Sequence, residues 1–101
     1  MRFEEERRRE QKVVIDYHEF QGLLYVRGNT YPIRDYLKSL GARWSMHQWE
    51  LKVPDTRYAR DKEGVRENER KLWAMAEKLK REIEEKYGIP VEIARRRWVW
   101  I

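Results

Sequence analysis

Basic and aromatic side chains are interleaved along much of this sequence, and these two residue types together can hold a single-stranded nucleic acid. Cations track the phosphates, and flat rings stack on exposed bases with about 1–3 kcal/mol per base. Arg outnumbers Lys by 15 to 8, and an Arg side chain can both pair with a phosphate and stack on a base. We therefore expect phosphate contacts from Arg27, Arg34, Arg43, Lys52, Arg95, Arg96 and Arg97, and stacking from Tyr25, Trp44, Trp98 and Trp100.

The positive charge of the 101-residue chain, +5 in all, is unevenly distributed. Residues 34–60 hold six basic and three acidic residues, and residues 89–101 hold three Arg and one Glu. Residues 61–87, by contrast, hold eight of each sign. A local basic excess is the electrostatic footprint of a polyanion binder. A net charge of this size is also ordinary for solubility alone, so the charge by itself leaves both interpretations open.

The composition narrows the class of protein. There is no Cys, which rules out disulfides, thiolate zinc sites and thiol catalysis. No apolar run approaches the roughly 18 residues of a membrane span, and the charged start MRFEEERRRE lacks the apolar stretch of a signal peptide. We expect a cytoplasmic protein. Many charged residues with few Cys, Asn and Gln are typical of a hyperthermophilic source.

Enzyme chemistry finds little support in the sequence. The two histidines share no ligand spacing, and there is neither a Gly-rich phosphate loop nor a serine nucleophile motif. We expect no enzymatic activity, no cofactor and no metal. One alternative stays open, because Glu50 and Lys52 form an acidic-x-Lys pair. With Asp16 or Asp35 as a further acid, such a pair is the core of a class of metal-dependent nucleases.

The first half of the chain predicts two hairpins around a short helix. Residues 12–20 and 23–28 are rich in β-formers and flank the turn signal QG. Thr30 is a favourable N-cap, Pro32 suits the first helical turn, and Gly41 marks the helix end. Residues 42–45 and 49–53 then predict two strands around the turn MHQ.

The tryptophans of the second hairpin have different expected surroundings. Trp49 shares a strand face with Leu51 and Val53, which predicts that its indole is buried. For Trp44 a core and a surface position both stay open, and the same holds for Trp98 and Trp100 in the last strand.

The second half predicts a long helix and a final strand. The helical pattern runs from Asp55 to Tyr87 with a break or kink at Gly64, and residues 91–101 follow as a strand. Heptad-like spacing of the apolar stripe fits packing on the protein's own sheet, or a homodimer through residues 65–87. The stripe consists of Val65, Leu72, Met75, Ala76, Leu79, Ile83 and Tyr87.

These elements define an α+β fold class with a small, mostly antiparallel sheet packed on one long helix. The order is ββαββ, the long helix, then the C-terminal β-strand. The length indicates one domain, 1–101, in which residues 1–11 form a charged N-terminal arm.

Residues 24–54 resemble a known family. The stretch GNTYPIRDYLKSLGARWS, followed by Trp49 and LKVP, is similar to ThermoDBP-type single-stranded DNA-binding proteins of hyperthermophilic archaea. The resemblance implies a binding cleft that is apolar and aromatic with a basic rim, and self-association through helices. It also implies contact residues within the module, namely Tyr31, Arg34, Arg43, Trp44 and Trp49. The ending RRRWVWI has no counterpart in the family pattern.

The sequence therefore predicts a non-enzymatic protein that binds single-stranded nucleic acid without sequence preference. DNA is the nucleic acid that we expect. The alternative is a protein-interaction or structural module, of viral origin for example, in which the tryptophans are buried and the charge only solubilises.

Overall fold

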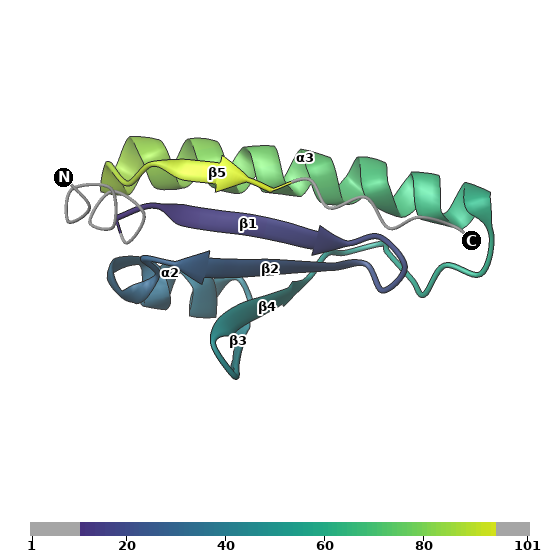
Figure 1. Ribbon diagram of the computed structural model, residues 1–101, viewed down its shortest axis with the longest axis horizontal. Coiled ribbons are helices and arrows are strands. Elements are labelled where there is room, and N and C mark those ends of the chain that lie inside the picture. Colours follow the sequence, from purple (N-terminus) through teal and green to yellow (C-terminus); the bar gives the residue numbers. More distant parts are fainter. Residues whose placement is uncertain (1–10, 95–101) are drawn as a thin grey trace, which may run out of the picture.

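The computed structural model describes residues 11–94 as a five-stranded sheet with a long helix packed along it (Figure 1). The strand order is β3-β4-β2-β1-β5. All neighbours are antiparallel except β1 and β5, which are parallel. This confirms the predicted α+β class. The elements are β1 (Val13–His18), β2 (Leu23–Gly28), the 3-10 turn η1 (Tyr31–Ile33), α2 (Arg34–Ser39), β3 (Arg43–Ser45), β4 (Gln48–Lys52), α3 (Lys62–Tyr87) and β5 (Val91–Ile93).

One face of the sheet, here called the helix face, forms the core with α2 and α3. The strand register aligns buried residues across it, with Tyr17 opposite Leu24 and Leu24 opposite Leu51. Because side chains alternate along a strand, the residues between them point to the second face, here called the outer face. Its central row runs Asp16, Tyr25, Glu50 and Arg43 across four strands.

The long helix α3 begins later than the sequence predicts. The expected start at Asp55 is wrong, because Asp55 has a left-handed φ of 64° and the following loop is tied to the β1–β2 turn. There the backbone N–H of Ala59 donates to the carbonyl of Phe20 at 2.7 Å. Asp61 is the actual N-cap, and its carboxylate accepts from the backbone N–H of Gly64 at 2.7 Å.

The expected break at Gly64 is also wrong, since this residue lies within the first turn of a continuous helix. Its lack of a side chain has a local reason. A Cβ there would lie 3.1 Å from Oδ1 of Asp61 and 3.3 Å from Cβ of Ala59. Gly64 therefore lets the capping carboxylate and the preceding loop approach the helix closely.

The apolar stripe of α3 packs on the protein's own sheet, which is one of the two arrangements that its spacing predicts. Leu72, Ala76, Leu79 and Ile83 are buried, whereas Tyr87 at the helix end is 41% exposed. Gly88, with a left-handed φ of 65°, ends the helix as predicted. The chain then returns into β5 beside β1 (Figure 1).

The N-cap predicted at Thr30 takes a different form. Thr30 precedes the 3-10 turn η1, and its side chain makes no capping hydrogen bond. Instead, its Oγ1 accepts a hydrogen bond from Nε1 of Trp49 at 3.2 Å. Gly41 has the left-handed φ of 89° that its predicted role after α2 requires.

The predicted N-terminal arm and most of the predicted last strand lie outside the described residues. β5 covers only the start of the strand expected over residues 91–101. The sites predicted at Arg95, Arg96, Arg97, Trp98 and Trp100 lie outside the described part of the chain, as do residues 1–10 of the predicted arm.

The cap of α3 gives a test of the fold. Replacing Asp61 by Ala should lower the free energy of unfolding by about 1 kcal/mol, because the first helical turn loses a satisfied N–H donor. Asp61→Asn should retain most of the stability, since Asn is an equally good N-cap. Urea unfolding followed by circular dichroism measures both, and equal stability of Asp61→Ala and the wild type would contradict this cap assignment.

Candidate nucleic-acid interface

The predicted contact residues in the described chain fall on both sides of the sheet. Tyr25, Arg27, Arg43 and Lys52 belong to the outer face, as the register requires. Arg43 and Lys52 are exposed there, while Tyr25 and Arg27 are half-buried. Trp44 lies on the helix-face side, because it pairs with Trp49 across β3 and β4.

On the outer face, cations alternate with carboxylates. Nη2 of Arg27 lies 2.9 Å from Oδ2 of Asp16, and its Nε donates to the same oxygen at 3.0 Å. Asp16 is only 4% exposed, so Arg27 neutralises a buried charge. Glu50 stands between Tyr25 and Arg43 in the central row. Arg27 is thus engaged by the protein itself, and this face offers phosphates a mixed rather than a positive surface.

The same row sets the ionisation of Tyr25. Burial, and then the negative charge of Glu50, raise the pKa of its phenol above the ordinary value of 10.0. Tyr25 is therefore neutral at physiological pH and can act as a half-buried stacking ring beside Glu50, without adding negative charge.

On the other side of the edge hairpin, two indoles have opposite surroundings. Trp49 is 6% exposed, as its strand face predicts, whereas Trp44 is 55% exposed. Their ring centroids lie 5.4 Å apart at 67°, an edge-to-face contact. Because Trp49 is also hydrogen-bonded to Thr30, it forms a fixed base on which Trp44 rests. More than half of the Trp44 side chain remains exposed to solvent.

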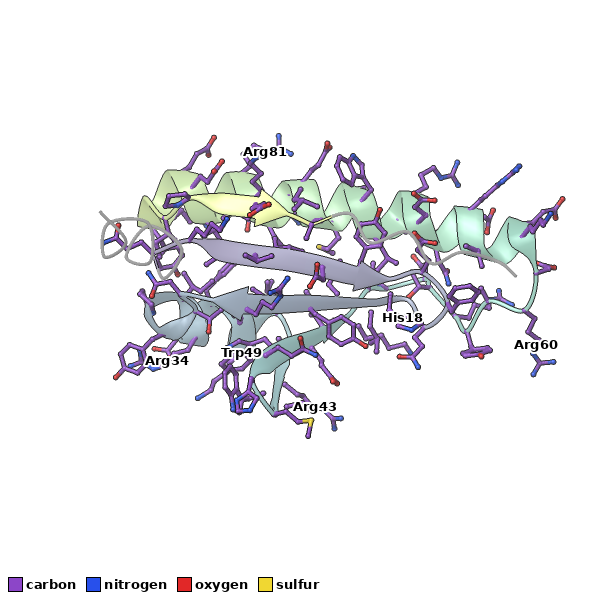
Figure 2. All side chains as sticks on the ribbon, viewed as in Figure 1. His18, Arg34, Arg43, Trp49, Arg60 and Arg81 are labelled. Carbon is purple, nitrogen blue, oxygen red and sulfur yellow. The ribbon has the colours of Figure 1, made fainter. Side chains whose placement is uncertain are left out.

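Tyr31 and Arg34 form a second exposed unit next to Thr30. The Tyr31 ring is 73% exposed, and Cζ of Arg34 lies 4.0 Å from its centroid. Nη1 of Arg34 also donates to the backbone carbonyl of Tyr31 at 2.7 Å. Stacking and hydrogen bonding together hold the guanidinium in one place. We call Tyr31, Arg34 and Trp44 the aromatic corner; Figure 2 shows Arg34 and Trp49 at this end of the molecule.

Arg34 of the aromatic corner, Lys38 of α2 and Arg43 on the outer face form no ion pair with a carboxylate in the described range, although Arg43 lies opposite Glu50 in the strand register. In residues 11–94, ion pairs within 4 Å join Lys12 to Glu92 and Arg27 to Asp16. Neither involves Arg34, Arg43 or the exposed Lys38 of α2. These charges are available to an external anion, unlike that of Arg27.

The segment η1–α2, which carries Tyr31 and Arg34 of this corner, is tied to α3. Ile33 and Leu37 are fully buried, and the hydroxyl of Tyr36 donates to Oε2 of Glu82. Burial, and then this hydrogen bond, raise the pKa of Tyr36 above its ordinary value. The hydrogen bond from Tyr36, and then nearby cations led by Lys78, lower the pKa of Glu82. The corner is therefore supported by the domain core.

The residue pattern alone does not predict two exposed side chains of this region, Tyr31 and Met46, as nucleic-acid contacts. Tyr31 was indicated only by the family resemblance, and Met46, 86% exposed at the hairpin tip, was not indicated at all. A signal for Tyr31 existed, since it precedes Pro32 and lies outside the helical apolar spacing that starts at Ile33. Met46 has a left-handed φ of 58°, which the tight turn imposes and the sequence does not reveal.

The acidic residues of the nuclease alternative are separated in the fold. Asp16 and Glu50 share the central row, but β2 lies between their strands, and Asp16 binds Arg27. Asp35 lies on α2. Within residues 11–94 no group of three His, Asp or Glu side chains is placed to hold a metal ion. A search of the same residues for a helix long and apolar enough to cross a bilayer finds none.

Comparisons with protein-family models, curated proteins and solved structures returned no match. The resemblance to ThermoDBP-type proteins therefore stays a prediction.

The contact between α2 and α3 predicts a pH dependence. Because Glu82 has a lowered pKa in the folded protein, its bond to Tyr36 stabilises the fold above the ordinary carboxyl pKa of 4.5. That contribution is lost as the pH falls from 4.5 through the folded pKa. In a double-mutant cycle of Tyr36→Phe and Glu82→Gln, the coupling measured by thermal unfolding should shrink in this range. A coupling that stays constant down to the acid limit of folding would contradict the assignment.

Proposed function

We propose that this protein binds single-stranded nucleic acid without sequence preference and without catalysis, and that this nucleic acid is DNA. One observation carries the proposal: two exposed aromatic rings, Tyr31 and Trp44, stand on a supported corner beside cations that no described carboxylate neutralises. Stacking rings combined with free cations are what sequence-tolerant binding of single strands requires.

Each part of the corner would have a distinct role in binding. The exposed ring of Trp44 would stack on one base, because its edge-to-face contact with the buried Trp49 holds it in place. Arg34 is already fixed on Tyr31, so little side-chain entropy is lost when its remaining N–H groups meet a phosphate. Lys38 and Arg43 would meet neighbouring phosphates. Every base has a flat face, so this arrangement favours no sequence.

The preference for DNA, a cytoplasmic location and a hyperthermophilic archaeal source also belong to the proposal. They are supported by the resemblance of residues 24–54 and by the charge-rich, Cys-free composition.

Loss of the exposed indole should weaken binding. Trp44→Ala should reduce the affinity for oligo-dT roughly 5- to 150-fold, the equivalent of one lost stacking contact of about 1–3 kcal/mol. Intrinsic fluorescence should be quenched when oligo-dT is added to the wild type at low salt, and this quenching should be smaller in the variant. Met46→Ala, at an exposed residue of the same hairpin, is the control. Absence of quenching in the wild type, or an unchanged affinity of Trp44→Ala, would refute the proposal.

Salt dependence tests the free cations separately. For single strands, the slope of log K against log salt is about −0.7 per neutralised phosphate, so Arg43→Gln should make the slope less negative by about 0.7. Arg66→Gln, at an exposed residue of α3, should leave the slope unchanged. Fluorescence anisotropy over a range of salt concentrations measures both. Equal slopes for the two variants would remove Arg43 from the interface.

A protein-interaction module is the second candidate, and the exposure of Trp44 and Met46 favours it. Large exposed apolar side chains beside an Arg are also typical of protein docking surfaces. This candidate predicts no response to oligo-dT in the experiments above.

A homodimer through residues 65–87 stays a prediction. Since Val65, Leu72 and Leu79 are already buried in the domain, pairing would have to use the side of α3 turned away from the sheet. Light scattering at several protein concentrations distinguishes monomer from dimer.

A further inference from the structure

A hollow of about 760 Å³ lies between the 55–61 loop and the first turns of α3, far from the aromatic corner. In Figure 2, Arg60 of this loop lies near the opposite end of the molecule from Arg34. The volume falls within the range of small-molecule sites, roughly 300–1,000 Å³. Its walls include Arg57, Tyr58 and Arg60 from the loop, and Glu67, Asn68 and Lys71 from the helix.

The loop wall is held in place at several points, although it has no regular secondary structure. Asn68, only 4% exposed, donates from Nδ2 to the carbonyls of Glu19 at 2.9 Å and Arg57 at 2.6 Å. Nζ of Lys71 donates to the carbonyl of Asp55 at 2.7 Å. Ala59 is bonded to the β1–β2 turn. The hollow is therefore preformed by contacts of the loop with α3 and with the β1–β2 turn.

The side chains that remain available in the hollow are of three kinds. Tyr58 is an aromatic ring that is 67% exposed. Arg57 and Arg60 form no ion pair with a carboxylate of residues 11–94. Glu67 is an exposed acceptor on the helix, whereas the carboxylate of Asp61 is engaged as the helix cap.

A nucleotide has a matching group for each of these. Its base stacks on an aromatic ring and its phosphate pairs with guanidinium groups, and every base carries an N–H group that can donate to a carboxylate. A bare anion would leave the ring unused and would face the carboxylates. An apolar ligand would leave the cations unpaired.

We propose that this hollow binds one nucleotide of the strand held at the aromatic corner, with the base on Tyr58 and the phosphate at Arg57 and Arg60. This inference rests on the proposed function for the identity of the ligand. It adds a second contact, formed by a different part of the chain, and so makes affinity depend on strand length.

A mononucleotide tests the hollow independently of the corner. Titration of the full chain with dCMP to about 10 mM, tenfold above a Kd of about 1 mM, should shift the NMR signals of the Gly64 amide and the Asn68 side-chain amide. Tyr58→Ala should reduce these shifts at least fivefold, while Arg81→Gln, at an exposed residue near the other end of α3, should leave them unchanged. Absence of shifts in the wild type, or equal shifts with inorganic phosphate alone, would overturn the nucleotide site.

Strand length tests the link between the two sites. Tyr58→Ala should weaken the binding of a long oligo-dC, but not that of the shortest oligo-dC that still quenches the fluorescence of Trp44. Equal effects on both lengths would overturn the inference that one strand occupies both sites. If dCMP shifts the hollow signals while no oligonucleotide quenches the tryptophans, the proposed function fails and the nucleotide site stands. If quenching occurs without dCMP shifts, the hollow inference fails alone.

Discussion

Packing of the α3 stripe on one face of the sheet is the interaction on which the rest of the structure depends. Leu72, Leu79 and Ile83 are buried to 1% exposure or less, and each contributes roughly 1.5–3 kcal/mol by leaving water. This packing assigns alternate residues of each strand to the core. It thereby also assigns the residues between them, including Tyr25 and Arg43, to the outer face.

The aromatic corner exists because the sheet extends beyond its helical cover. β3 is an edge strand, and its Trp44 pairs with the buried Trp49 and contacts that indole edge to face. An indole that is 55% exposed on an edge strand is a reason to look for a ligand.

Arginines of the same type have different roles in this fold. Arg27 compensates the buried Asp16, and removing it would leave an uncompensated charge inside the protein. Arg34 is fixed by a ring and a carbonyl, neither of which neutralises it. Only the second kind of arginine keeps its full charge for a partner, so counting the arginines in the sequence overestimates the available positive charge.

Residue patterns were enough to predict those elements whose signals lie within a few neighbouring positions. Alternation in residues 49–53 predicted the buried Trp49, and the α3 stripe and the glycines at 41 and 88 set a helix face and two helix ends. These features depend on neighbours within a few residues, through backbone geometry and side-chain periodicity. The α+β class followed from their order.

Which candidate residues share a surface, and which cations lack a carboxylate partner, follows only from the folded arrangement of residues 11–94. Only the strand register shows that Arg27 meets Asp16 and that Trp44 stands over Trp49. The non-helical loop before α3 is likewise set by bonds to the distant β1–β2 turn. Such contacts join residues far apart in the chain, and their energies depend on distance and burial, which no local pattern contains.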